Sequence, residues 1–573
     1  MAGKLRSHAC GSIRGTTRAE FPARNFRACD RRRGPKRPAV ITPQSDPTQW
    51  FTVELAPHES AHRADTRGTI EHPRNLPSAL DPFKSARPAS LNPPRAPGTQ
   101  KNCAQLRPPR STMNPFPSAR FCALPLLLLA LATLSAAPAA SPSKPNIIFI
   151  LADDLGYGDL GCMGATDIKT PHLDRLAAEG VKFTDFYANA PVCSPTRAGF
   201  MTGRWQQRIG LEFAFGYQVE QSRRVNGAWV PEPDIHGLGL PLGETTIADR
   251  LKTAGYATGA FGKWHLGYRD AYNPTKRGFD EYFGELLGHA DYYQHTYYDG
   301  TPALREGLQP VKREGYFTDL VNARAVKFVR DHAAHPFFLY VPHLAVHGPF
   351  QPPDAPGTPF VTKETMLHGS RAIYKAMLER VDRGVGEILA ELDRQGIAEN
   401  TLVVFSSDNG GERWSRNTPL FHHKATLWEG GIRVPCLMRW PAKLPRGKVT
   451  AQMGITMDLH ATFLAAAGIS APSEKTLDGL DLLPLLTADA APRERTFFWR
   501  IDRSNRKQRA VREGQWKYLN DGNTMDLLFD LAADIGERTN LNFRHPEITA
   551  RLKQKLAAWE AEMDASDREI LVR

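Results

Sequence analysis

A short segment around Cys193 combines residue types that could do nucleophilic chemistry. Cys193 stands two residues before Pro195, which suits a first helical turn, and four residues before Arg197. A thiol at a helix N-terminus, one turn from a guanidinium, lies where an anion is stabilised. A lone Cys is more often a buried, inert residue, but a nearby Arg is a costly neighbour for a residue that only fills a core. We therefore interpret Cys193 and Arg197 as functional.

Oxygen ligands follow two continuous apolar runs of strand length. Asp153 and Asp154 come after residues 146–151, and Asp408 and Asn409 come after residues 401–406. Carboxylate and amide oxygens at strand ends suit Ca²⁺ better than zinc. Asp-Asn-Gly alone is above all a turn former, so each pair is weak evidence by itself. Together with the Cys193 segment, the two pairs predict a metal site.

Three further segments hold lysine and histidine side chains that could bind an anion or transfer a proton. They contain Lys263 with His265, His343 with His347, and Lys424 with His422 and His423. Residues 263 and 265 are two apart, so on an extended segment their side chains point the same way. A solvated lysine and ordinary loop histidines would explain the same letters without any function.

The order of these segments resembles the type I sulfatases of the alkaline-phosphatase-like superfamily. Residues 193–197 (CSPTR) and 202–204 (TGR) resemble the family's signature, residues 262–267 its G-K-W-H-x-G motif, and residues 423–435 its G-K-x-x-x-x-E-G-G-x-R-V-P motif. Thr196 stands where many members have Ser, and His423 replaces a frequent Gly. The resemblance extends from about Pro145 to the C-terminus.

The resemblance implies a role for each of these residues. A separate maturation enzyme would convert Cys193 to Cα-formylglycine, whose hydrate is the nucleophile. Ca²⁺ would be held by Asp153, Asp154, residue 193, Asp408 and Asn409. Arg197, Lys263 and Lys424 would bind the sulfate oxygens. His347, with Lys424, would protonate the leaving alcohol, and His265 would take a proton from the formylglycine hydrate. His347 matches the family's H-x-P segment, so we assign His343 a structural role.

Residues 283–298 are rich in His, Asp and Tyr, which hydrogen-bond and stack on sugars. We expect His289 to bind substrate, and a purely structural loop of this composition is the alternative. Similar segments occur in arylsulfatase and N-acetylgalactosamine-6-sulfatase relatives. The resemblance therefore implies a sulfated saccharide substrate with a galacto-configured unit, and His422 and His423 could line the same pocket.

Two other functions stay open on the sequence. A phosphatase or phosphodiesterase of the same superfamily would also bind a tetrahedral anion, but would be expected to use Ser or Thr with two zinc ions and more His ligands. A non-catalytic sulfated-glycan binding protein would carry Cys193 unconverted. The mass of the peptide containing Cys193 separates catalysis from binding.

Helical and strand patterns alternate from residue 146 to residue 406, which predicts an α/β fold with a largely parallel, alkaline-phosphatase-like sheet between helices. Expected elements include one strand over 181–187, a helix over 246–255 that is followed by the segment 257–265, and a helix over 371–395. Strand patterns at 496–500, 508–519 and 527–531 then precede a helix at 546–563. We expect a catalytic domain over 144–484 and a small α+β subdomain over 485–573.

The net charge of +12 comes entirely from the N-terminal part of the chain. Residues 1–112 hold 20 Lys and Arg against 8 Asp and Glu, so the remainder is neutral and no nucleic-acid face is expected. Residues 113–140 resemble a signal peptide that is too short for a stable membrane span. We expect translation to start at Met113 and the protein to be secreted or periplasmic; a genuine leader with an internal signal anchor is the alternative.

Overall fold

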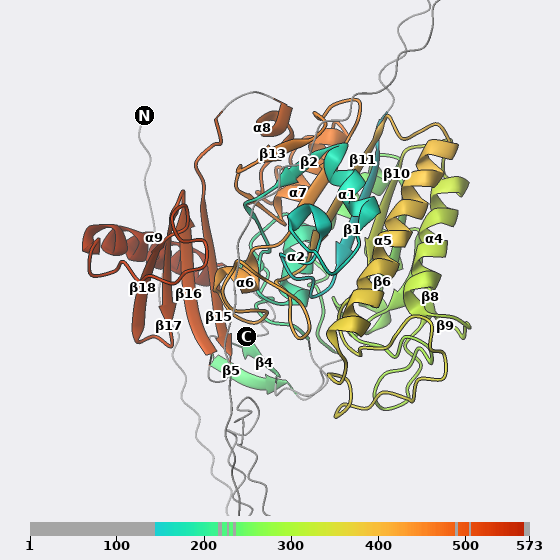
Figure 1. Ribbon diagram of the computed structural model, residues 1–573, viewed down its shortest axis with the longest axis horizontal. Coiled ribbons are helices and arrows are strands. Elements are labelled where there is room, and N and C mark those ends of the chain that lie inside the picture. The colour runs from blue at the N-terminus through green and yellow to red at the C-terminus, as the bar shows by residue number, and fades with distance from the viewer. Residues whose placement is uncertain are drawn as a thin grey trace, which may run out of the picture. The chain divides into compact units, whose positions relative to one another are not determined.

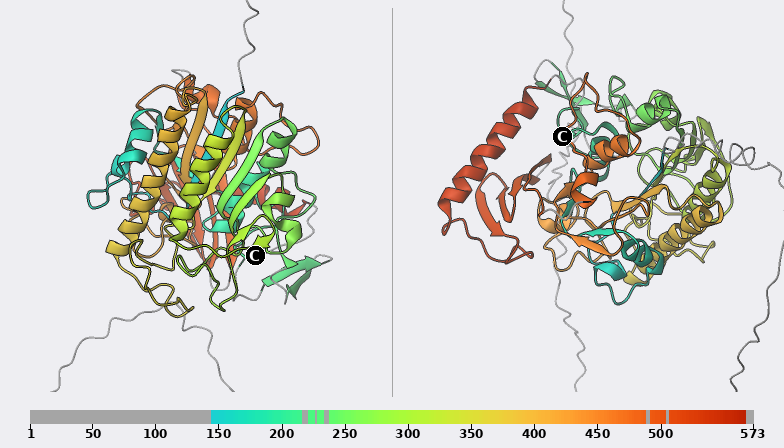
Figure 2. Two further views of the ribbon diagram at one scale, coloured as in Figure 1. Left: turned by 90° about the vertical axis from the view of Figure 1, so that its right-hand side faces the viewer. Right: turned by 90° about the horizontal axis from the view of Figure 1, so that it is seen from above.

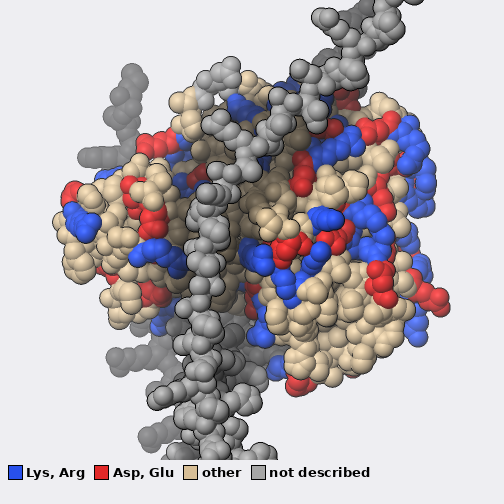
Figure 3. All heavy atoms as spheres, viewed as in Figure 1, with Lys and Arg blue, Asp and Glu red and all other residues tan. Residues whose placement is uncertain are grey.

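The computed structural model describes residues 144–215, 221–225, 228–232, 237–487, 491–503 and 506–566. The basic extension expected at 1–112 and the signal peptide expected at 113–140 lie outside these residues. Within the described residues, no helix is long and apolar enough to cross a membrane. Figure 3 shows that Lys and Arg side chains are interspersed with Asp and Glu over the visible face.

A ten-stranded mixed sheet forms the centre of the described part, in the order β13-β2-β12-β11-β1-β10-β6-β7-β8-β9 (Figure 1). Its middle strands run parallel to one another: β11 (Thr401–Ser407), β1 (Asn146–Ala152), β10 (Phe337–Pro342), β6 (Ala257–Lys263) and β7 (Glu281–Glu285). The outer strands are β13 (Lys448–Thr450), β2 (Val181–Phe183), β12 (Cys436–Arg439), β8 (Arg305–Glu306) and β9 (Gln309–Pro310). The largely parallel central sheet is therefore confirmed.

Helices cover both faces of this sheet (Figures 1 and 2), because alternate residues of a buried strand point to opposite sides. Phe149 of β1 packs in one core and its neighbour Ile150 packs in the other. The first core contains α2 (Cys193–Thr202), α3 (Ile247–Thr253) and α7 (Asp458–Ala466). The second contains α1 (Pro171–Ala178), α4 (Phe317–Asp331) and α5 (Arg371–Arg394). The continuous apolar run at β1 thus reflects burial on both faces.

The C-terminal part forms a four-stranded antiparallel sheet with one long helix against it (Figure 2). Its elements are β15 (Thr496–Arg503), β16 (Arg506–Glu513), β17 (Trp516–Asp521), β18 (Met525–Asp530) and α9 (Pro546–Asp564). Leu552, Leu556 and Trp559 share the buried side of α9, as expected from their helical spacing. Their core also includes Tyr187 and Ile432 from the first part of the chain.

The remaining elements are short. They are β3 (Phe186–Tyr187) with β14 (Gly454–Ile455), the hairpin β4 (Gln221–Val225) and β5 (Ala228–Glu232), α6 (Glu429–Ile432), α8 (Leu483–Thr487), and the 3₁₀ helices η1 (Gly161–Met163), η3 (Asp270–Tyr272) and η4 (Pro274–Lys276).

Two expected strands are divided in the structure. The segment 181–187 bends at Thr184 and Asp185, so β2 pairs within the large sheet while β3 pairs with β14. The segment 508–519 turns at Gly514, whose φ is 55°, and spans β16 and β17. Asp185 and Gly514 are residue types that strands disfavour, and each marks the position of its bend.

Candidate active site

The candidate site lies where the parallel strands of the central sheet end. Because these strands run in one direction, their carboxyl ends meet at one edge of the sheet. β1 leads into Asp153, β11 into Asp408, β6 ends at Lys263 and β10 leads towards His347. The topology therefore brings together side chains that are more than 250 residues apart, as the contact from Asn409 to Asp154 shows.

Cys193 is the first residue of α2, as its spacing to Pro195 predicts. Its Sγ lies 3.5 Å from Asp153 Oδ1 and 3.6 Å from Lys263 Nζ. Burial, with Asp153 nearby, raises the pKa of the Cys193 thiol well above its usual range, against the opposing effect of Lys263. The unmodified thiol is therefore held neutral and is a poor nucleophile here.

Arg197 is fully buried and directs its guanidinium at two carboxylates. Nη2 lies 2.8 Å from Asp153 Oδ2 and 2.8 Å from Asp408 Oδ2, and Nη1 donates to the Lys263 carbonyl at 2.8 Å. Burial alone would raise the pKa of Asp153, but nearby cations, Lys263 first, hold it well below its usual range. Lys263 Nζ completes this group at 2.5 Å from Asp153 Oδ2. Arg197 therefore orients the two carboxylates.

Asp154 connects the strand ends to Lys424. Lys424 Nζ lies 2.7 Å from Asp154 Oδ1, and Asn409 Nδ2 donates to the same oxygen at 2.7 Å. Burial raises the pKa of Asp154 to about 7 although Lys424 lowers it. A bound divalent cation would reverse this shift, because it is the largest local charge in such a site.

The donor set fits a hard cation. Ligand atoms of Asp153, Asp154, Cys193 and Asp408 all lie within 4.8 Å of one another. Asn409 Oδ1 is buried and has no hydrogen-bond partner among the described residues, which is costly for an amide oxygen that binds nothing. Carboxylate and amide oxygens are the ligands that Ca²⁺ takes. The residues present therefore fit the predicted metal site.

His265 lies beyond β6 rather than within it, so alternation along a strand is not what places its side chain. Its φ is 56°, a left-handed conformation. Its Nε2 donates to the Phe215 carbonyl at 2.6 Å, which leaves the lone pair on Nδ1. Burial, and then Lys263, lowers the pKa of His265 well below its usual range. His265 is thus neutral and can accept a proton at Nδ1.

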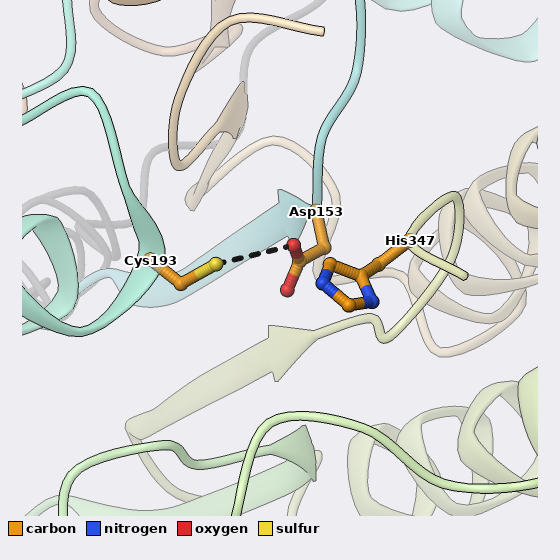
Figure 4. Close-up of side chains that lie close together, drawn as sticks. All are labelled: Asp153, Cys193 and His347. Atoms are coloured by element: carbon orange, nitrogen blue, oxygen red, sulfur yellow. Dashed lines mark hydrogen bonds between the residues drawn. The ribbon is translucent and has the colours of Figure 1, made fainter. Parts of the chain in front are cut away.

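His347 also lies at the cluster, and Figure 4 shows its imidazole and the Cys193 thiol converging on Asp153. Its Nδ1 donates to the Gly348 carbonyl at 2.6 Å, and its Nε2 lies 3.8 Å from Asp154 Oδ2. Burial, with Lys263, lowers the pKa of His347 well below its usual range. His343 is fully enclosed, and burial lowers its pKa to about 3.

The loop histidines separate into buried and exposed residues. His289 is buried and stacks on Tyr298 with ring centroids 3.9 Å apart, and burial with Lys263 lowers its pKa to about 3. His422 and His423 are exposed beside Lys424. The charge of Lys263, the lysine predicted to bind sulfate, therefore acts on the His289 ring.

Glu285, at the end of β7, was not predicted from the sequence. It lies opposite Lys263 in the register of β6 and β7, and its Oε2 accepts from Gly288 N at 2.8 Å. Burial raises its pKa to about 7, against Lys263. Asp153 directly follows a continuous apolar run, whereas Glu285 is the last residue of a strand whose pattern at 281–285 is weak, so the same signal did not identify it.

Comparisons with known proteins show the family to which the chain belongs. The family model described as "Sulfatase" matches residues 145–469, and the model "N-sulphoglucosamine sulphohydrolase, C-terminal" matches residues 419–562. N-acetylgalactosamine-6-sulfatase of Homo sapiens is 33% identical over 72% of this chain and 84% of its own length. Steryl-sulfatase of Mus musculus is 32% identical over 76% and 86%. A solved structure, "Ps i-CgsB in complex with k-i-k-neocarrahexaose", is 34% identical over 73% of this chain and 93% of its own, with a TM-score of 0.64.

The fold and the strand-end site define an enzyme of the alkaline-phosphatase-like superfamily. Within it, the chain belongs to the type I sulfatase family and is a sulfuric ester hydrolase.

Proposed function

We propose that the protein hydrolyses sulfate esters of saccharides with a Cα-formylglycine formed from Cys193 and a bound Ca²⁺. The observation that carries this proposal is the position of Cys193, at the first residue of α2 and within 3.6 Å of both Asp153 and Lys263. A thiol held neutral by burial is unsuited to attack, whereas a side chain converted by a maturation enzyme would stand in the same place.

The two absent groups would supply distinct chemistry. The formylglycine hydrate offers one hydroxyl for attack on sulfur and a second whose deprotonation expels sulfate. Asp153, Asp154 and Asp408 would hold Ca²⁺ together with Asn409 Oδ1 and residue 193, and the ion would supply positive charge to the reacting oxygens.

The chain's own residues bind the ester and move protons. Lys263 and Lys424 are cations that contact the carboxylates of Asp153 and Asp154, and they bind sulfate oxygens, while Arg197 keeps the carboxylates oriented. His265 is a neutral base with its lone pair on Nδ1, and it accepts the proton of the second hydroxyl.

His347 and Lys424 serve the leaving alcohol. Lys424 carries a proton because Asp154 and other anions outweigh burial and raise its pKa well above the usual range. An anionic ester beside His347 would raise the pKa of that imidazole again, because a nearby negative charge favours its charged form. Either group can therefore donate the proton that the alkoxide needs.

The saccharide assignment rests on residues 283–298 and on the relatives. Buried His289 stacks on the half-buried Tyr298 with ring centroids 3.9 Å apart, and burial, with Lys263, lowers the pKa of His289 to about 3. The relatives include N-acetylgalactosamine-6-sulfatases and a structure bound to a neocarrahexaose. We propose a galacto-configured sulfated unit of a polysaccharide or glycosaminoglycan as the substrate.

A substrate screen with peptide mass spectrometry tests the proposal. Position-defined monosulfated sugars are compared with p-nitrophenyl sulfate, and the peptide containing residue 193 is weighed. We expect the aldehyde form of this peptide, the highest kcat/KM on a sulfated sugar, and a loss of sugar turnover in His289→Ala. An unmodified thiol in protein from the native host, or preference for the aryl ester with unchanged sugar rates in His289→Ala, contradicts the proposal.

We also propose that residues 113–140 act as a signal peptide, so that the enzyme is secreted or periplasmic. The charge distribution and the apolar run after Met113 support this. Peptide mapping of the native N-terminus tests it: recovery of a peptide from before Met113 contradicts the expected start.

A further inference from the structure

The segment that carries Lys424 is held by main-chain hydrogen bonds from several directions. Lys424 N donates to the Gly411 carbonyl at 3.1 Å, and Ala425 N donates to the Pro191 carbonyl at 2.9 Å. These two bonds connect the segment to the loop that follows Asn409 and to the residues before Cys193. Two later N–H groups of the segment, those of Leu427 and Glu429, donate instead to side chains of the C-terminal part.

Gln508 of β16 accepts the first of these hydrogen bonds. Its Oε1 accepts from Leu427 N at 2.8 Å, across 81 residues of sequence. Gln508 and Leu427 are both buried, with 4% and 0% of their surfaces exposed, so water cannot replace the amide oxygen. A buried N–H without an acceptor is unfavourable, and the segment would move to find one.

Glu537 accepts the second of these hydrogen bonds. Its Oε2 accepts from Glu429 N, the first residue of α6, at 2.6 Å. Lys517 Nζ lies 2.9 Å from Glu429 Oε1 and 2.8 Å from Glu537 Oε1, and the side chains of all three residues are fully buried. The C-terminal part thus supplies two acceptors and one cation to the eight residues that begin at Lys424.

We propose that Gln508 and Glu537 are positioning residues for Lys424, so that the C-terminal part of the chain completes the sulfate-binding site without touching substrate. This inference rests on the proposed role of Lys424 in binding sulfate. Lys424 contacts Asp154 at 2.7 Å from one side of the cluster, and its ammonium can reach that position only if its main chain is held. Small displacements of such groups reduce binding and turnover strongly.

The test compares two glutamines of the C-terminal sheet. Gln508→Met removes the acceptor and keeps the side-chain length, and Gln508→Glu keeps an acceptor oxygen. Gln515→Met is the matched control, because Gln515 is exposed beside the same sheet and contacts Asp530 instead. Each is made in the full, converted enzyme. Measurements are kcat, KM, the inhibition constant of inorganic sulfate and the melting temperature, with rates normalised to the aldehyde content of the residue 193 peptide.

We expect Gln508→Met to raise KM and the sulfate inhibition constant about tenfold, while its melting temperature stays within a few degrees of the wild type. Gln508→Glu should restore most of the sulfate affinity, and Gln515→Met should match the wild type. If Gln508→Met does not fold, Gln508→Asn, which shortens the reach of the amide, is judged by the same criterion.

Unchanged sulfate affinity in a folded Gln508 variant overturns the inference, as does an equal loss in Gln515→Met. A purely structural role would lower the melting temperature and the active fraction while leaving the inhibition constant of the active molecules unchanged. Failure of the proposed function is seen separately, as a wild-type enzyme that hydrolyses no sulfated sugar.

Discussion

The side chain of Asn409 indicates where a cation would bind. Its Nδ2 is satisfied by Asp154 and by the Gly410 carbonyl, whereas its Oδ1 is buried without a partner among the described residues. A cation bound to Asp153, Asp154 and Asp408 would satisfy that oxygen and offset the mutual repulsion of three buried carboxylates.

Asp408→Asn should therefore reduce both bound metal and turnover. Asparagine keeps an oxygen that can accept from Arg197, so the fold should be retained, but it removes one charge from the cluster. We expect the wild type to contain calcium and the variant to lose at least about 100-fold in activity. Elemental analysis and rate measurements check this, with Asp354→Ala, an exposed site, as the control. Zinc without calcium in the wild type, or full activity in the variant, contradicts the assignment.

Glu285 makes stability depend on pH. Its pKa in the folded protein is raised to about 7 from an ordinary value of 4.5, because burial disfavours the charged form. The stabilisation from the neutral acid is present below pH 4.5 and is lost as the pH rises through 7. Glu285→Gln, which stays neutral, should gain stability relative to the wild type between pH 5 and pH 8, by up to about 3 kcal/mol.

Denaturant unfolding of both proteins at pH 5 and pH 8 measures this difference. Glu281→Gln, on the same strand but exposed, should follow the wild type at both values. Equal pH dependence in Glu285→Gln and the wild type would show that the carboxyl is ionised without penalty.

At the scale of elements, the turn after β7 packs against His265, the proposed base. Gly288 has a φ of 102°, and a Cβ at this position would lie 2.4 Å from His265 Cε1. The carboxylate of Glu285 closes the turn by accepting from Gly288 N. The main chain of the turn therefore lies directly against the imidazole whose Nε2 is bonded to the Phe215 carbonyl.

Gly288→Ala should displace His265 and lower kcat at least tenfold, because proton transfer requires hydrogen-bond distance and alignment. Gly243→Ala is the control, since a Cβ there meets nothing within 4 Å. Turnover and circular dichroism distinguish a displaced base from a misfolded chain. A Gly288→Ala enzyme with wild-type kcat would mean that the turn yields without moving the ring.

At the scale of the whole molecule, the C-terminal sheet shares a core with the catalytic part. The core on which α9 packs contains Tyr187 and Ile432 from the first part of the chain and Trp499 from β15. Trp499 is fully buried, and its Nε1 donates to the Ala188 carbonyl at 2.9 Å. The ion pair between Lys517 and Glu429 crosses the same boundary. Separating the parts would expose large aromatic surfaces and buried charges together.

A chain that ends at residue 484 should therefore fail to fold as an active enzyme, although it contains every predicted site residue. We expect insoluble protein or a strongly lowered melting temperature, and a single cooperative transition for the intact protein. A chain that ends at Ser566 is the control. Recovery of a soluble, active 144–484 fragment would show that the catalytic part folds without the C-terminal part.

The sequence by itself determined which residues follow the buried strands and where the reactive helix begins. Asp153, Asp154 and Asp408 directly follow continuous apolar runs, and Pro195 and Arg197 mark the first turn of α2, so local pattern was sufficient. The alternation of helix and strand was sufficient for the parallel sheet, because such crossovers place strand ends at one edge.

Only the tertiary structure decided how these residues are oriented and supported. The left-handed backbone of His265 and its bond to Phe215 depend on chain segments 50 residues apart. The contact between Gln508 and Leu427 depends on two elements that no local pattern connects. The bend at Asp185 likewise follows from separate partners, β12 for β2 and β14 for β3. Such contacts are set by long-range packing, which outweighs the small differences in local propensity.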